Sequence, residues 1–160
     1  MDNELIPWND QGQLEVLTFH LDQDIFAIEA GLVCEILDLL TETAVPGSRD
    51  LVGSVVNFRG KVIPIADLRL AFGLPRGEAT IDARIVVIEL DLDGEPVLIG
   101  LKTDKVLEVT TLGQETREPT PAVGMRWRRD FIRSLFRHGD SVVVLPNVEA
   151  IFARAEAAAA

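Results

Sequence analysis

The sequence predicts a mostly β protein: two small β-barrels of about five strands each, packed together, with short helices and a helix near the C-terminus. Three observations support this prediction. Hydrophobic residues make up 48% of the chain, and Val, Ile and Leu supply most of them. Short apolar segments alternate with turn-forming residues along the whole length. The two halves of the chain also resemble each other weakly.

The similarity between the halves consists of short patterns that recur in the same order. Phe26-x-Ile28 is followed by Val33-Cys34-Glu35-Ile36, and Ile99-x-Leu101 is followed at the same spacing by Val106-Leu107-Glu108-Val109. Chance matching of short apolar patterns is the alternative. The shared order favours duplication, and duplication of a small unit predicts two barrels.

In the first half, strands are expected where apolar residues alternate or cluster between turn formers. These expected strands cover residues 13–21, 25–28, 33–40 (one strand, or a turn and then a strand), 55–56 and 62–65. Residues 22–24 supply a hairpin turn, residues 41–47 a loop, and residues 49–53 fit one helical turn. Asp67 stands where a helix N-cap belongs, before a short helix that stops at Gly73.

The second half begins after residues 73–78, Gly-Leu-Pro-Arg-Gly-Glu, the strongest break in the chain. The strands expected after it cover residues 84–90, 95–101, 106–111, 131–136 and 141–145. Residues 113–124 are polar and contain two prolines, so a loop is expected there. Asn147 is placed to cap a last helix from Val148 to about Ala158.

These elements predict one domain over residues 13–153. Its first barrel is expected at about 24–75 and its second barrel at about 82–146. Strand 14–21 either belongs to the first barrel or is shared between the two. Residues 1–12 and 154–160 are expected to be flexible ends.

Composition and charge exclude several classes of protein. The formal net charge is −11 and the sequence pI is about 4.5, so phosphate backbones and anionic membranes repel the chain, and nucleic-acid binding is not expected. There is no apolar run long enough for a membrane span and no signal-peptide pattern at the N-terminus. Cys34 is the only cysteine, which fits a reducing compartment. It is expected to be a small buried or half-buried residue rather than a reactive thiol.

A tight turn between two strands is predicted at Asn57-Phe-Arg-Gly-Lys-Val-Ile-Pro-Ile-Ala-Asp-Leu68. Asn57 and Gly60 tolerate positive φ angles. Pro64 lacks a backbone donor, so its strand is expected at an edge, at a bulge, or with Pro64 near the strand's own end. Arg59 is a long cation within the turn. It is either a recognition residue on a rigidly held loop or an ordinary surface residue, alone or in an ion pair.

This turn resembles the CheW family, the adaptor proteins of bacterial chemotaxis arrays. The family pattern is Gly-x-x-Asn-x-Arg-Gly before an apolar strand that ends Pro-x-x-Asp-Leu. The matching residues are Asn57, Arg59, Gly60, Pro64, Asp67 and Leu68, while Ser54 stands at the first Gly. Val33-x-Glu35-Ile36 also resembles a family motif. The resemblance covers about residues 14–153 and implies two SH3-like five-stranded barrels that share a hydrophobic interface.

The resemblance implies a non-enzymatic scaffold in the cytoplasm, at receptor arrays near the inner membrane. Its implied partners are a CheA-type histidine kinase, bound through the kinase's CheW-like regulatory domain, and the cytoplasmic tip of methyl-accepting chemoreceptors, bound against the groove between the barrels. Val33, Glu35, Ser54 and Arg59 are the implied partner contacts. We expect Glu35 and Arg59 to form an ion pair at this interface, since an exposed pair alone gives only about 0–1 kcal/mol of stability.

Several positions depart from the family pattern. Ser54 and Ser134 replace Gly, residues 145–147 replace a Leu-Leu-Asp type of sequence, and the basic segment 125–129 is atypical. Trp127 within it is a candidate partner contact, or equally a buried residue that plugs the groove. These departures also fit an adaptor of a specialised pathway that resembles the type IV pilus systems, which we keep as the alternative.

Residues suited to catalysis or metal binding are scarce. His20 and His138 lie in different halves, and with a single cysteine they make a poor zinc site. There is no P-loop, G-x-G-x-x-G or G-x-S-x-G sequence. No enzyme, metal or cofactor is therefore expected. Two further classes stay open: a ligand-binding or enzymatic β-barrel, which a deep polar pocket would favour, and a homo-oligomeric structural protein, which ring formation by the protein alone would favour.

Overall fold

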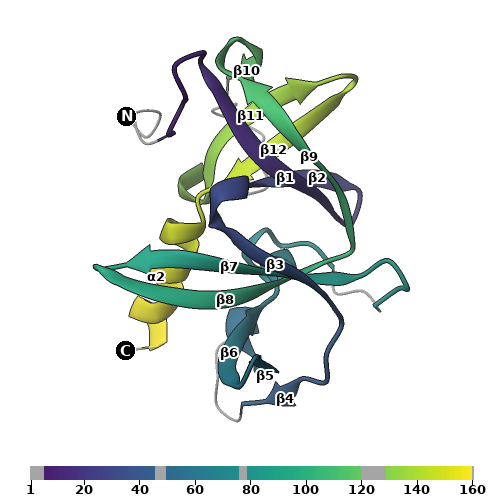
Figure 1. Cartoon of the computed structure of the whole chain (residues 1–160), viewed down its shortest axis with the longest axis vertical. Helices are drawn as coiled ribbons and strands as arrows, with labels where there is room; N and C mark the ends of the chain where they lie inside the picture. Colours follow the sequence, from purple (N-terminus) through teal and green to yellow (C-terminus); the bar gives the residue numbers. More distant parts are fainter. Residues whose placement is uncertain (1–5, 46–49, 76–78, 120–128, 160) are drawn as a thin grey trace.

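The computed structural model describes residues 6–45, 50–75, 79–119 and 129–159, and its strands form two curled sheets (Figure 1). The lower sheet in Figure 1, here called barrel 1, has the strand order β3-β7-β8-β6-β5-β4. Its strands are β3 (Val33–Asp38), β4 (Thr43–Ala44), β5 (Ser54–Phe58), β6 (Lys61–Ala66), β7 (Arg84–Leu92) and β8 (Glu95–Thr103).

The upper sheet, here called barrel 2, has the order β10-β11-β12-β2-β1-β9. Its strands are β1 (Gln13–Leu21), β2 (Asp24–Glu29), β9 (Lys105–Gly113), β10 (Arg117–Glu118), β11 (Ile132–His138) and β12 (Ser141–Pro146). Each sheet thus has five longer strands and one edge strand of 2 residues, β4 or β10. The predicted mostly β fold with two barrel-like subdomains is confirmed.

The helices are short except the last. They are the α-helices α1 (Leu68–Ala71) and α2 (Val148–Ala159) and the 3₁₀ turns η2 (Ala30–Leu32), η3 (Asp50–Val52), η4 (Gln114–Thr116) and η5 (Arg129–Phe131). Both predicted caps are present: Asp67 Oδ1 accepts the N–H of Arg69 at 3.1 Å, and Asn147 Oδ1 accepts the N–H of Ala150 at 3.1 Å. In the part of the chain that the structure describes, no helix is long and apolar enough to span a membrane.

The two barrels exchange a hairpin, and this corrects the predicted division of the chain. The β1–β2 hairpin of the first half pairs with β9 and, in parallel, with β12 of the second half. The β7–β8 hairpin of the second half pairs with β3 and, in parallel, with β6 of the first half. Contiguous barrels at about 24–75 and 82–146 are therefore wrong. Local patterns predict a hairpin, but only tertiary packing decides which strands its edges join.

The exchange agrees with the internal similarity of the sequence. The two sheets have the same order when β1 to β6 are matched with β7 to β12, and a helix, α1 or α2, follows the last strand of each set. Each half therefore contributes one hairpin to the opposite barrel. Neither half contains all the strands of one barrel.

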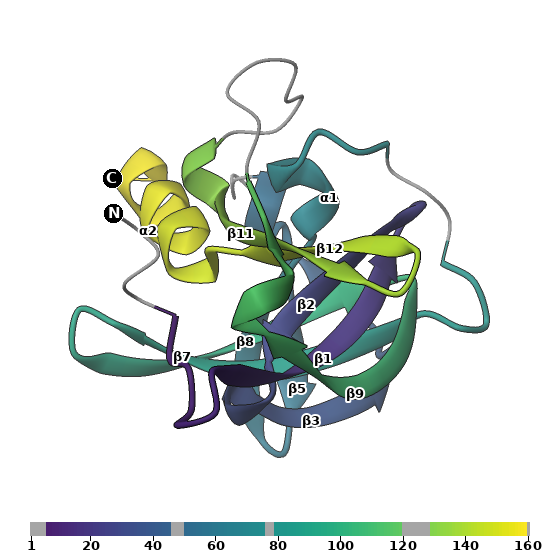
Figure 2. The same ribbon diagram turned by 90° about the horizontal axis from the view of Figure 1, so that it is seen from above.

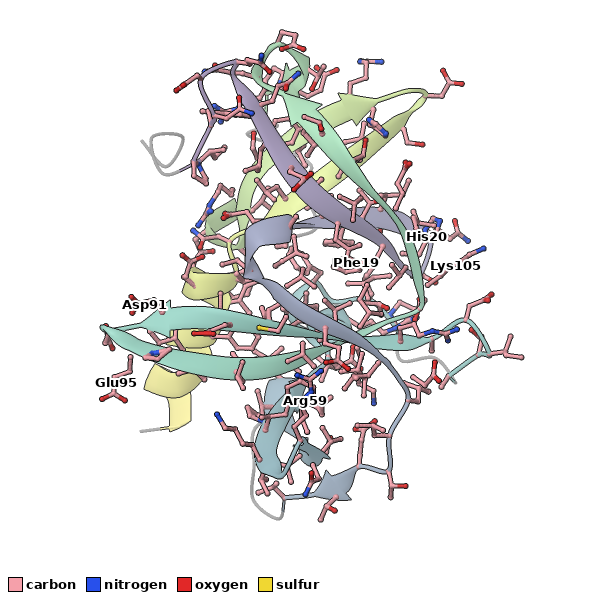
Figure 3. All side chains as sticks on the ribbon, viewed as in Figure 1. Phe19, His20, Arg59, Asp91, Glu95 and Lys105 are labelled. Atoms are coloured by element: carbon pink, nitrogen blue, oxygen red, sulfur yellow. The ribbon has the colours of Figure 1, made fainter. Side chains whose placement is uncertain are left out.

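The largest hydrophobic cluster lies between the barrels. It joins Phe19 and Phe26 of barrel 2 to Phe72 after α1 and to the buried face of α2, and Figure 3 shows Phe19 in this central position. The ring centroids of Phe26 and Phe72 are 4.9 Å apart. Figure 2 shows α2 beside β11, and the helix also contacts η5 and β7. Each barrel has in addition a smaller core of its own.

Helix α2 runs from Val148 to Ala159, as predicted to within one residue. Two other details differ from the expectations. Ile6 is only 4% exposed and Trp8 packs edge-on against Phe136 with ring centroids 5.8 Å apart, so these two residues of the expected flexible end pack against the fold. The short strands β4 and β10 lie in segments predicted as loops, because 2 residues carry no alternating pattern. The outer limits of the domain at residues 13 and 153 stay a prediction.

Candidate partner-binding site

The turn between β5 and β6 holds Arg59 in an unfavourable backbone conformation. Arg59 has φ 52° and Gly60 has φ 82°, the pair of positive φ angles that a two-residue hairpin turn of type I′ requires. Asn57 Oδ1 accepts the N–H of Gly60 at 3.0 Å and closes the turn. A side chain at positive φ costs about 1–2 kcal/mol. Arginine therefore occupies a position that glycine would fill at lower energy.

Two contacts hold the Arg59 side chain. Its guanidinium carbon lies 5.2 Å from the ring centroid of Phe58, and Nη2 donates a hydrogen bond to Glu35 Oε1 on β3. The Arg59 side chain is 72% exposed and that of Glu35 is 32% exposed. Figure 3 shows Arg59 close to β3 on barrel 1. The ion pair predicted from the sequence is present; its place in an interface stays a prediction.

A β-bulge sets the direction of Glu35. Val33 pairs with Ile88 and Glu35 with Val87, so Cys34 is the extra residue on β3. A bulge turns the following side chain out of the regular alternation, and here that side chain meets Arg59. Cys34 itself is exposed, which corrects the expectation of a buried or half-buried thiol. Val33 is half-buried against the cluster between the barrels.

Exposed apolar residues lie on the strands that carry the pair. Val62, paired with Asn57 across the turn, is 71% exposed, and Ile36 next to Glu35 is 42% exposed. Apolar side chains around a charged pair are typical of a protein-binding surface. Sequence reasoning missed Val62, although alternation with the buried Ile63 and Ile65 was a usable signal. We call Glu35 and Arg59, together with Val62 on the strand after the turn, the barrel 1 face.

The comparisons with known proteins agree with this geometry. The CheW-like domain family matches residues 15–156 of the chain.

The chain belongs to the CheW-like family.

Its relatives include a Rhizobium etli protein named "Probable chemotaxis protein CheW", 30% identical over 94% of this chain and 95% of that one. The chemotaxis protein CheW of Klebsiella aerogenes is 28% identical over 90% of this chain and 84% of its own. A solved structure of the scaffolding protein TtCheW from Thermoanaerobacter tengcongensis matches with a TM-score of 0.73 and 25% identity, covering 84% of this chain and 88% of that one. The predicted family and its chemotaxis adaptor class are thereby confirmed.

Ser54, which stands at the first Gly of the motif quoted above, lies at the opposite end of β5 from the turn that carries Arg59. Its hydroxyl donates to Glu42 Oε1, and Lys102 Nζ lies 3.0 Å from Glu42 Oε2. Burial by itself would raise the pKa of Glu42, but the hydrogen bonds from Ser54 and Lys102 and the charge of Lys102 leave this pKa below its usual value. The structure thus gives Ser54 an internal partner, and its predicted role as a partner contact stays a prediction.

We expect Ser54→Ala to lower the free energy of unfolding at pH 7 by about 1 kcal/mol, because a hydrogen bond to a charged carboxylate is lost. The pKa of Glu42 is lower in the folded chain than its usual 4.5, so this contribution is present above pH 4.5 and is lost as the pH falls through the folded-state pKa. Urea unfolding of both proteins at pH 7 and at pH 3 measures this. Ser141→Ala on barrel 2 is the control, and a difference that persists undiminished at pH 3 contradicts the assignment.

Barrel 2 has a counterpart of the barrel 1 face, as the duplication requires. Glu108 on β9 is the counterpart of Glu35, and its Oε2 lies 3.6 Å from His138 Nε2 at the β11–β12 turn. A bulge again precedes the glutamate, since Phe19 pairs with Val106 and Thr18 with Glu108. A glutamate beside a basic side chain at a hairpin turn therefore recurs in both repeated units of this CheW-like fold. Trp127 lies outside the described residues, and its predicted role stays a prediction.

The interiors of both barrels are filled by side chains. Barrel 1 encloses Val56, Phe58, Ile63, Ile65, Ile85 and Val87, and barrel 2 encloses Leu14, Val16, Ala27, Leu112, Phe136, Val143 and Leu145. A solid core counts against a ligand-binding barrel. Among the described residues, no group of three or more His, Cys, Asp or Glu side chains is arranged to hold a metal ion.

Proposed function

We propose that this protein is a non-enzymatic adaptor that couples methyl-accepting chemoreceptors to a CheA-type histidine kinase. The Glu35–Arg59 pair is the observation that supports this most strongly. It lies on a partly apolar, exposed face of a CheW-like fold, and a bulge and a tight turn hold its two members. The named relatives are chemotaxis and scaffolding proteins.

The energetics of Arg59 favour recognition over stability. An exposed ion pair contributes about 0–1 kcal/mol, and an exposed cation–π contact about 0.5–1 kcal/mol. The positive φ angle of Arg59 costs about as much as both contacts contribute. Arginine is also among the residues that most often dominate binding at protein interfaces. We infer that Arg59 is retained for contact with a partner, and that the partner is the CheW-like regulatory domain of the kinase, bound barrel to barrel.

The same proposal includes the receptor and the place in the cell. A receptor's cytoplasmic helical tip would lie against the groove between the barrels as an amphipathic helix in an apolar groove. The adaptor would then work in the cytoplasm, at receptor arrays near the inner membrane. An adaptor of a type IV pilus pathway would bind a different kinase from an adaptor of a chemotaxis pathway. Binding assays with the kinases of both pathways therefore distinguish the two alternatives.

Reversal of the charges tests the proposed interface. We expect Arg59→Glu and Glu35→Arg each to weaken binding of the kinase regulatory domain by about 30-fold, the effect of one hot-spot residue. The double variant should recover part of this loss, because it restores an attractive pair. Isothermal titration calorimetry measures the affinities, and circular dichroism confirms that each variant is folded.

Arg137→Glu is the matched control. Arg137 is 67% exposed on barrel 2 and pairs with Glu118 at 2.6 Å, so this variant changes the net charge equally and also breaks an ion pair. Its affinity should stay close to wild type. Equal losses in the single and double variants would show that the pair does not act as a unit. Failure of the wild type to bind any kinase domain would mean that this CheW-like fold serves another use.

A further inference from the structure

Arg133 on β11 joins three elements where the chain passes from barrel 2 to barrel 1. Its side chain is only 7% exposed. Nη1 lies 2.8 Å from Glu29 Oε1 at the end of β2, and Nη2 lies 3.1 Å from Glu149 Oε1 in the first turn of α2. The chain leaves barrel 2 directly after Glu29, through η2, and enters barrel 1 as β3. Arg133 therefore holds the crossover between the barrels.

Net stability does not explain this buried cluster. A buried charge is costly unless all its hydrogen-bonding groups are satisfied, and Arg133 Nε is buried with no acceptor within the described ranges. Burial raises the pKa of Glu29 by more than the attraction of Arg133 lowers it, and the charge of Glu149 raises it further. Buried ionic groups of this kind are retained in some proteins because they fix one arrangement of the chain.

The group that Arg133 holds lies shortly before the barrel 1 face. Glu29 is the N-cap residue of η2, and its carboxylate makes no capping hydrogen bond there. The carboxylate is turned to Arg133 instead. After η2 come Val33, the bulge at Cys34, and Glu35. The direction in which β3 leaves the crossover is therefore set at Glu29.

The second crossover has an equivalent arrangement. Asp104 lies between β8 and β9, where the chain returns from barrel 1 to barrel 2. The side chain of Arg69, from α1, is 12% exposed and pairs with Asp104. Asp104 Oδ2 also accepts the N–H of Asp22 at 2.6 Å. An arginine with little exposed side chain thus stands at each point where the chain changes barrel.

We propose that Arg133 is a positioning residue that fixes the β2–β3 crossover, and with it Val33 and Glu35 opposite Arg59, while Arg69 does the same for the start of β9. The apolar cluster between the barrels is not directional, so it can hold the barrels together without fixing how a crossover strand leaves. The geometric part of this proposal is independent of any partner. Its consequence for kinase binding rests on the proposed function.

Residue-resolved amide hydrogen exchange on the full-length protein tests the geometry. Arg133→Met keeps a long side chain and removes the charge. We expect exchange of the amides of residues 30–35 to accelerate about tenfold more than exchange of Phe136 and Val143 in barrel 2. Arg69→Met is the matched control and should accelerate exchange around residues 104–106 instead. A uniform acceleration across both barrels, or unchanged exchange over residues 30–35, would overturn the proposal.

A second variant covers the case in which Arg133→Met does not fold. The double variant Arg133→Met, Glu29→Gln removes the buried arginine charge and the charge of its half-buried partner, so no unpaired charge is left inside. It should be stable and still exchange faster over residues 30–35. Kinase-domain affinity should fall about 2- to 30-fold in the same variant. If the wild type binds no kinase domain, the exchange data still decide the role of Arg133, so the two proposals fail separately.

Discussion

Arg59→Gly is expected to weaken binding of the kinase regulatory domain by about 30-fold or more while the protein stays as stable as the wild type. Glycine adopts the φ angle of 52° without strain, and relief of this strain raises the free energy of unfolding by about 1–2 kcal/mol. This gain offsets the lost ion pair with Glu35 and the lost contact with Phe58, each about 1 kcal/mol or less. Calorimetric titration gives the affinity, and urea unfolding gives the free energy of unfolding.

Asp93→Gly is the matched control for the backbone effect. Asp93 has φ 55° and precedes Gly94 in the β7–β8 turn, so it repeats the geometry of Arg59 and Gly60 away from the barrel 1 face. This variant should gain stability and bind normally. Wild-type affinity in Arg59→Gly would show that the guanidinium is not the recognition group. A loss of stability above about 2 kcal/mol would assign Arg59 a structural role instead.

The elements that the sequence predicts correctly are those formed by neighbouring residues. Asp67 and Asn147 cap the helices that follow them because a cap needs only the next turn of chain. The hairpins form for the same reason. The exchange of hairpins depends on pairs far apart, such as Ile65 with Gly100. One signal was available: a Cβ at Gly100 would lie 2.6 Å from Ile65 Cδ1 and 2.9 Å from Ile85 Cγ2, and glycine within a strand often marks such a close approach.

The candidate site could also be predicted only in part from the sequence. Glu35 and Arg59 could be paired from the sequence because both lie in motifs shared with one family and carry opposite charges. The bulge at Cys34 could not be predicted, since it is defined by the register of β3 against β7. The hydrogen bond from Ser54 to Glu42 could not be predicted either. Glu42 directly precedes β4, which has only 2 residues and therefore shows no strand pattern in the sequence. Position in a motif identified the residues, and long-range register decided their contacts.

The apolar cluster shared by the two barrels predicts that they unfold as one unit, and Phe26→Ala tests this. Phe26 on β2 is fully buried and packs against Phe72, which follows β6 and α1. Its removal should cost about 3–5 kcal/mol, because a large cavity opens in the cluster between the barrels. Loss of this cluster should destabilise both barrels equally, since strands of both barrels bury side chains in it.

Hydrogen exchange at increasing urea concentration measures the two barrels separately, with the amide of Val56 reporting on barrel 1 and that of Val143 on barrel 2. Both amides should lose protection by the same free energy in Phe26→Ala. Phe26→Leu leaves a smaller cavity and serves if the alanine variant does not fold. Wild-type protection at Val56 together with lost protection at Val143 would mean that barrel 1 folds by itself. The shared cluster argues against that result, because Val86 and Leu101 of barrel 1 are buried in it together with Phe26 of barrel 2.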